Sequence, residues 1–473
     1  MQEDFDQEDN EPTDELIERY QNFKMGISYA YFEEEDYERI IDFYDDKEDL
    51  DEALLVTEEG LEQFPFSSQL MLRKADFLLA ARKHADALEV LEMVELYDNS
   101  NIDLYILKSD ALLALDEKEK VAQLLEFAIN RFEGDEKVDL LLELSDVYDD
   151  YEEFDKIFDC LKLILEEDPN NEEALYKICF WTDHTGRNEE SIRLHQKIID
   201  DFPYNEIAWF NLAAAYQGLK LYEKAIDAYQ YAVVIDEKFD YAFRNMGDAY
   251  LRLRKYDEAI EALSTVLTIS SPDIVIYEVI GYCYQKKGNL VEARTNYIKA
   301  VLLAPHDAKL QYKVAVTFML EKNWLSASKY LENALEINKN TLHYNLAMGE
   351  CLFNLKKTKS AIQYFVSAVN TKPNSPTAWE ALIKCLIQSE MLEDALDQCI
   401  VAKARTQNKP IFIFYQSAIL LLLGMQKEAL IHLEDAMEKA PKLVNKFLAI
   451  DTAVLNNHLV VDILSRYKKK RRS

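Results

Sequence analysis

The feature that most limits how this chain can fold is a mostly small residue that recurs every 34 residues. One step of the series, between Val121 and Ile157, is 36 residues long. The twelve positions are Ala53, Ala87, Val121, Ile157, Ser191, Ala225, Ala259, Ala293, Ala327, Ala361, Ala395 and Ala429. Tandem units of this length are typical of a solenoid, in which each unit packs only against its neighbours. The sequence therefore predicts twelve consecutive repeats.

Two further columns keep the same register. Twelve residues before the recurring position lies a mostly small side chain, and sixteen residues before it lies an often bulky one. In one repeat these residues are Ala213 and Trp209, ahead of Ala225. Nine of the ten prolines fall near the boundary between repeats, where a helix breaker is tolerated. The pattern predicts two helices per repeat, which approach closely through the small columns.

The spacing within the repeats resembles that of the tetratricopeptide repeat. Two segments carry the resemblance: Trp209-x2-Leu212-Ala213-x2-Tyr216 with Ala225-x3-Tyr229, and Tyr277-x2-Ile280-Gly281-x2-Tyr284 with Ala293-x3-Tyr297. The resemblance implies an all-α fold, a right-handed superhelical solenoid of stacked antiparallel helix pairs whose first helices line a concave face. It also implies a non-enzymatic scaffold or adaptor that binds proteins or peptides on that face.

The repeat register divides the chain into five parts. We expect an acidic disordered tail over residues 1–13, an N-terminal capping helix over 14–33, twelve repeats over 34–441, C-terminal capping helices over 442–466 and a basic tail over 467–473. No apolar stretch approaches the ~18–20 residues that span a membrane, and the N-terminus lacks the basic and apolar regions of a signal peptide. We therefore expect a cytoplasmic protein.

Charge is unevenly distributed along the chain. Residues 1–60 carry 23 acidic and 4 basic residues, and residues 1–307 carry a net charge of −42. Residues 308–473 carry a net charge of +8, and the total is −34. Such a balance bears on partners rather than on fold. It predicts a protein or peptide partner with a basic segment, and neither nucleic acid nor a membrane surface.

Acidic residues also line one face of the predicted first helices. Some lie one residue after the small column and others lie seven residues earlier, so both sets share a helix face. Apolar residues lie beside them. The predicted ligand-binding groove comprises Glu35, Asp42, Asp76, Asp103, Asp110, Asp139, Asp146 and Glu173, with Leu72, Ile106, Leu142, Tyr176 and Phe210 as its apolar floor. An alternative interpretation is a solvated acidic surface, because acids are plentiful in this half. A basic segment with an apolar anchor is the expected ligand.

Two lysines further along the chain invite comparison with the carboxylate clamp of this family. Lys309 and Lys313, with Arg244, form the nearest match to its basic side chains. Asp248 and Val279 stand where the clamp has asparagine, and an aspartate repels a carboxylate. We therefore expect no clamp and interpret Lys309 and Lys313 as a basic patch.

The residue types that usually carry chemistry show no catalytic or metal-binding arrangement. There is no His-x3-His, His-Glu-x2-His or Cys-x-x-Cys spacing, no glycine-rich phosphate loop and no glycine-flanked serine. Cys283, Cys351 and Cys385 share one repeat position in a helix contact, which predicts buried, unreactive thiols. We expect no catalytic residue, no metal and no cofactor.

Three hypotheses about function follow. The first is a non-enzymatic scaffold that holds a basic protein segment along its acidic face. The second is a structural protein that self-associates in a salt-sensitive way, its acidic part meeting the basic end of another copy. The third is a regulatory or assembly subunit of a larger complex. Twelve repeats without a catalytic arrangement favour the first.

Overall fold

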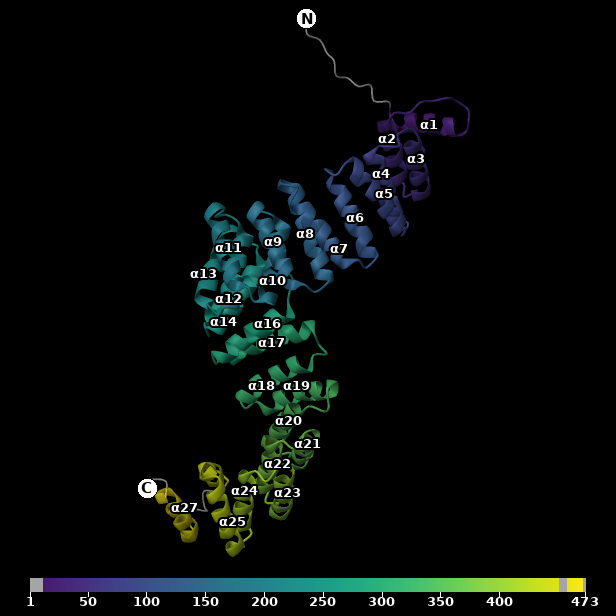
Figure 1. The fold of residues 1–473 in the computed structure, drawn as a ribbon. Helices are drawn as coiled ribbons and strands as arrows, with labels where there is room; N and C mark the ends of the chain where they lie inside the picture. The colour runs from purple at the N-terminus through teal and green to yellow at the C-terminus, as the bar shows by residue number, and fades with distance from the viewer. Residues whose placement is uncertain (1–11, 451–456, 471–473) are drawn as a thin grey trace. The chain divides into compact units, whose positions relative to one another are not determined.

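The computed structural model describes residues 12–450 and 457–470, and every regular element within these ranges is helical. Consecutive helices pack as pairs joined by short turns (Figure 1). The chain divides into two compact units, residues 1–242 and 243–473, and the boundary lies within α14 (Asp240–Arg252). The all-helical, paired repeat architecture predicted from the sequence is confirmed.

The first unit contains α1 (Thr13–Lys24) followed by helix pairs. The first helices of the pairs are α2 (Glu34–Asp45), α4 (Ser68–Ala80), α6 (Ile102–Ala114), α8 (Gly134–Asp150), α10 (Glu172–Thr185) and α12 (Glu206–Gly218). Their partners are α3 (Leu50–Gln63), α5 (His84–Tyr97), α7 (Lys118–Ile129), α9 (Phe154–Glu167), α11 (Asn188–Asp201) and α13 (Tyr222–Ile235).

The second unit continues the pattern from α14. Its first helices are α16 (Ile274–Lys286), α18 (Ala308–Leu320), α20 (Leu342–Asn354), α22 (Pro376–Gln388) and α24 (Pro410–Leu422). The second helices are α15 (Tyr256–Ile269), α17 (Leu290–Leu303), α19 (Trp324–Ile337), α21 (Thr358–Thr371), α23 (Leu392–Arg405) and α25 (Gln426–Lys439). A short 3-10 turn (Pro441–Leu443), α26 (Val444–Leu448) and α27 (His458–Lys470) follow.

The recurring column has one structural role throughout. Each of its twelve positions is the fourth residue of a second helix. Each side chain there is at most 2 % exposed, so the column marks the buried contact between helices. The longer step between Val121 and Ile157 coincides with α8, which has 17 residues where the other described first helices have 12 to 14. The extra length therefore lies in one first helix.

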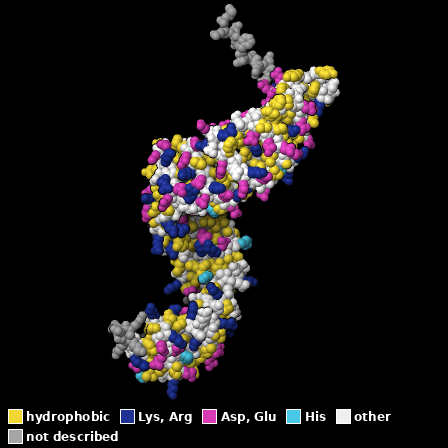
Figure 2. All heavy atoms as spheres, in the orientation of Figure 1, with side chains coloured by type: hydrophobic (Ala, Val, Ile, Leu, Met, Phe, Trp, Pro, Cys, Tyr) yellow, Lys and Arg dark blue, Asp and Glu magenta, His cyan; other side chains and the backbone are white. Residues whose placement is uncertain are grey.

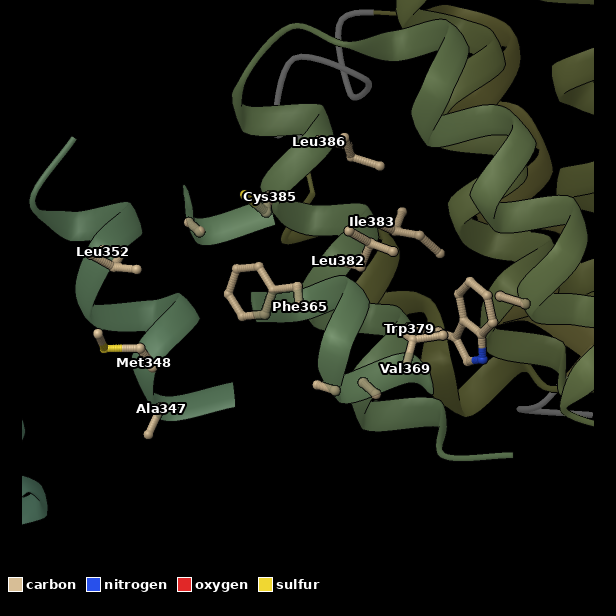
Figure 3. Packing of buried hydrophobic residues seen from close by; sticks show 14 of the residues in the cluster. Ala347, Met348, Leu352, Phe365, Val369, Trp379, Leu382, Ile383, Cys385 and Leu386 are labelled. Carbon is tan, nitrogen blue, oxygen red and sulfur yellow. The ribbon is translucent and has the colours of Figure 1, made fainter. Parts of the chain in front are cut away.

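The small column of the first helices leaves room for a large side chain of the second helix. A Cβ atom added at Gly349 would lie 2.6 Å from the ring of Phe365, and one at Gly281 would lie 2.7 Å from the ring of Tyr297. Figure 3 shows Phe365 between α20, with Met348, and α22, with Leu382. Glycine at these positions allows an aromatic ring to fill the contact between helices.

The turn inside each pair contains one residue with positive φ. These residues are Glu48, Arg82, Asp116, Glu152, Gly186, Lys220, Arg254, Gly288, Lys322, Lys356, Glu390 and Gly424. Only three are glycine, because the left-handed conformation costs other residues only about 1–2 kcal/mol. The next N–H closes the turn: that of Lys83 donates to the carbonyl of Leu78 at 2.8 Å, and that of Lys357 to Leu352 at 2.9 Å. Helices commonly end in this way.

The two ends of the chain differ in detail from the bounds predicted from the sequence. The helix expected over 14–33 ends at Lys24, because Gly26 adopts a φ of +70°, and residues 27–33 are not helical. Val460 and Ile463 of α27 pack in one cluster with Leu433 of α25. Residues 467–470 of the expected basic tail belong to α27, whereas 471–473 and the acidic residues 1–11 lie outside the described residues.

Candidate functional site

The predicted groove residues all lie on first helices of the first unit. Each of α2, α4, α6, α8 and α10 contributes at least one acidic residue, and α12 contributes only Phe210. Asp76 is half-buried, whereas the other predicted acids are exposed. We call the surface that these side chains share the first-helix face.

The structure brings four of the predicted residues together in one pocket of the first-helix face. Leu72 and Asp76 of α4 meet Asp103 and Ile106 of α6 around a pocket of about 330 Å³. Gln69, Arg73 and Leu107 complete its lining. The lining thus combines two carboxylates and one guanidinium group with three aliphatic side chains.

Three carboxylates on consecutive first helices have no ion-pair partner among the described residues: Asp76 of α4, Asp110 of α6 and Glu143 of α8. We call these three the acidic row. Partial burial raises the pKa of each above its usual value. Repulsion between neighbours adds to this, since the charge of Asp76 raises the pKa of Asp110, and the charge of Asp110 raises the pKa of Glu143.

Glu143 was not among the residues predicted from the sequence. The prediction placed Asp146 in the column by counting back from Ile157, on the far side of the longer step. Counting forward 34 residues from Asp110, the preceding acid of that column, reaches Leu144, so neither register singles out Glu143. The Ser109 hydroxyl donates to the Glu143 carboxylate at 3.3 Å. The place of Glu143 beside Ser109 comes from the packing of α8 against α6, which the repeat period does not specify.

Other predicted acids are held in ion pairs. Arg73 pairs with Asp42, and also lies 3.6 Å from the carboxylate of Asp45. Lys177 lies 2.9 Å from the carboxylate of Asp146 and 2.8 Å from that of Glu173. Asp42, Asp146 and Glu173 are therefore partly neutralised, whereas Glu35, Asp103 and Asp139, like the acidic row, have no ion pair among the described residues.

The predicted apolar floor is uneven. Leu72 is buried, and Ile106 and Leu142 are half-buried. Tyr176 is 61 % exposed. Phe210 packs against the rings of Tyr229 and Phe239, with centroids 5.7 and 5.1 Å away. Tyr176 therefore offers the most accessible apolar surface, whereas Phe210 belongs to an aromatic cluster.

The predicted basic patch contains an acid that the sequence prediction did not include. Glu278 of α16 pairs with Lys313 and lies 2.9 Å from the ammonium group of Lys309, both on α18. Burial alone would raise the pKa of Glu278, but the hydrogen bonds from the two lysines outweigh it and lower the pKa. Figure 2 shows acidic and basic side chains next to one another among apolar ones over α16–α19. The two lysines are thus partly neutralised.

The cysteines lie mostly inside the helix contacts. Cys160, Cys283, Cys351, Cys385 and Cys399 are buried, and Cys179 is half-buried. Burial raises the pKa of each thiol, for example to about 12 at Cys160, so all six are thiols at neutral pH. Among the residues that the structure describes, no group of His, Cys, Asp or Glu is arranged to hold a metal ion.

Within 12–450 and 457–470, none of the helices combines the length and the apolar character needed to cross a bilayer.

The repeats match models of known families. The tetratricopeptide repeat is found at residues 41–101, 207–239, 243–273 and 274–307. Stacked helix pairs with a 34-residue period define an α-solenoid. The chain belongs to the tetratricopeptide repeat proteins, as the repeat spacing predicted.

One curated relative and two solved structures illustrate the similarity. The anaphase-promoting complex subunit CDC16 of Saccharomyces cerevisiae is 21 % identical over 357 residues, which are 73 % of this chain. The match spans only 41 % of that relative's length. A chain of the APC/C hetero-tetramer Cut9-Hcn1 is 14 % identical, with a TM-score of 0.33, over 87 % of this chain and 96 % of that one. The C-terminal part of a TPR repeat-containing protein from Cytophaga hutchinsonii is 17 % identical, with a TM-score of 0.44, over 54 % and 99 %.

Proposed function

We propose that this protein is a non-enzymatic scaffold that binds a basic segment of another protein along the first-helix face of its first unit. Its membership of the tetratricopeptide repeat proteins supports protein binding in general. The acidic row is the observation that carries the specific proposal. Asp76, Asp110 and Glu143 lie on consecutive first helices without ion-pair partners among the described residues, whereas Asp42, Asp146 and Glu173 are paired.

The electrostatics of the acidic row favour a cationic ligand. Burial, and then the charge of a neighbouring carboxylate, raise the pKa of each, although the nearby Arg73 guanidinium partly offsets this at Asp76. A lysine or arginine between two of them replaces repulsion by attraction, and this gain is larger at a partly desolvated site than in bulk water. The pocket between Leu72 and Ile106 accepts the apolar stem or a neighbouring apolar side chain. An extended or helical segment with basic residues at intervals matches both features.

Binding of a fluorescein-labelled peptide of alternating leucine and lysine pairs, followed by anisotropy, tests the proposal. The variant Asp76→Asn, Asp110→Asn, Glu143→Gln removes the acidic row. Its matched control, Asp86→Asn, Glu119→Gln, Asp155→Asn, changes the net charge equally but alters exposed positions on the second helices α5, α7 and α9. We expect the first variant to bind about 30-fold more weakly, from a loss of roughly 0.7 kcal/mol per carboxylate.

The control should bind within about threefold of the unaltered protein, since long-range charge alone is screened. Equal weakening of both variants would show that net charge, and not the first-helix face, attracts the peptide. Full retention of binding by the acidic-row variant would refute the proposal outright.

A second candidate function is that of a subunit in a multiprotein assembly. The alignment with an anaphase-promoting complex subunit over 357 residues favours it. Purification of the tagged chain from its native cells should then yield partners in fixed proportions. A chain that elutes alone at both low and high salt speaks against this candidate and against self-association.

A further inference from the structure

Figure 1 shows α11, α12 and α13 close together in the first unit. Residues of these three helices line another pocket of that unit, away from the acidic row. It has a volume of about 520 Å³. Its lining comprises aromatic, acidic and aliphatic side chains: Gln196, Ile199, Asp200, Trp209, Leu212, Tyr216, Lys224, Asp227, Ala228 and Tyr231. Two of the three helices, α11 and α13, are second helices, so this pocket is separate from the first-helix face.

The aromatic side chains of this pocket are held in place. The rings of Trp209 and Tyr231 stack, with centroids 4.4 Å apart and planes 20° from parallel. The Trp209 indole N–H donates to the carbonyl of Pro203 at 2.9 Å, which fixes the orientation of the ring. The Gln196 amide donates to the Tyr216 hydroxyl at 3.0 Å. Tyr231 remains 56 % exposed, so one face of the stack is open to a ligand.

The charged side chains of the pocket favour a cation. Asp200 of α11 and Asp227 of α13 are exposed, and neither has an ion-pair partner in the described part of the chain. Lys224 is the only basic residue of the lining, and its ammonium group lies 5.5 Å from the centre of the Tyr216 ring. The chain's own lysine thus already places a cation against one aromatic ring of this pocket.

We propose that this pocket binds an arginine side chain of a partner protein. The planar guanidinium group stacks on the exposed face of Tyr231, which continues the Trp209–Tyr231 stack by one layer. Asp200 and Asp227 accept its N–H groups, and Ile199 and Leu212 contact its aliphatic stem. Arginine suits the pocket better than lysine because its flat, weakly hydrated cation both stacks and donates in a plane.

The test uses the indole N–H signals of the full-length protein labelled with 15N. The chain has four tryptophans, so Trp209→Phe assigns the signal of Trp209. The probes are blocked glycine-rich peptides with one central arginine, lysine or citrulline, the last being uncharged but similar in shape. We expect the arginine peptide to shift the Trp209 signal saturably, the lysine peptide to bind at least about threefold more weakly, and the citrulline peptide to leave the signal unchanged.

Two variants probe the two halves of the proposal. Tyr231→Ala removes the stacking face, and Asp227→Asn removes a carboxylate from an exposed position without altering a helix contact. Both should abolish or weaken the arginine response while circular dichroism stays unchanged. Lysine binding as tightly as arginine, or an undiminished response in Asp227→Asn, overturns the proposal. The acidic-row variant should keep the Trp209 response, so failure here and failure of the proposed scaffold function remain distinguishable.

Discussion

Two sets of neighbouring first helices carry partly buried carboxylates with opposite results. In α4, α6 and α8, Asp76, Asp110 and Glu143 repel one another, and burial and repulsion raise their pKa values. In α16 and α18, Glu278 faces Lys309 and Lys313, and its pKa is lowered. The fold is the same in both places. The charge of the residue on the next first helix determines the outcome. A lysine there forms an internal ion pair with the carboxylate, whereas an acid there leaves the carboxylate available to an external cation.

Glu278→Gln should produce the largest effect on stability. It leaves Lys309 and Lys313 without their shared partner at a site that is only partly exposed to water. We expect a local loss of about 1–2 kcal/mol, less than for a fully buried pair. Hydrogen exchange of the α16 and α18 amides measures this directly, because repeat proteins open locally. Glu261→Gln, at an exposed position of α15, is the control. Equal protection in the two variants would contradict the stabilising role of the pair.

Asp110→Lys should give the acidic row an internal ion pair like the one that Glu278 makes with Lys309 and Lys313. The new cation lies between Asp76 and Glu143 and replaces two repulsive contacts with attractive ones. We expect a gain of about 0.5–1 kcal/mol in the protection of α4–α8. Asp110→Asn, which only removes the repulsion, should give a smaller gain. The interpretation of the acidic row as repulsive fails if either variant destabilises these helices or if the order is reversed.

The two regions should also respond differently to pH. A carboxylate whose pKa is raised on folding binds protons more tightly in the folded state, so stability increases as the pH falls toward its raised pKa. Between pH 7 and 5, amides of α4–α8 should therefore gain protection by a few tenths of a kcal/mol. Glu278, with a lowered pKa, loses its contribution only below about pH 4.5, where the unfolded chain begins to bind protons. Parallel changes in both regions, after correction for intrinsic exchange, would contradict this difference.

The sequence predicted the parts of this structure that follow from a fixed period. Ala225 and its equivalents are buried at one position of every second helix, and Gly186, Gly288 and Gly424 mark a turn with positive φ. The sequence did not predict which side chains form ion pairs between repeats. Arg73 reaches Asp42 across 31 residues, and Glu278 reaches Lys313 across 35, so neither pair lies in one column. A long side chain can pair with residues in several neighbouring columns. Only the packed structure determines which of these residues it contacts.

The smallest predicted effect concerns single pKa values within the acidic row. Asp110→Asn should lower the pKa of Glu143, because the charge of Asp110 is one of the causes that raise it. Asp103→Asn should instead lower the pKa of Asp76, because the charge of Asp103 is one of the causes that raise it. The pKa of Glu143 should stay unchanged in this variant. Carboxyl 13C chemical shifts followed through a pH titration measure both values. If both variants move both groups equally, the carboxylates respond to the overall charge of the unit and not to their neighbours on the next helix.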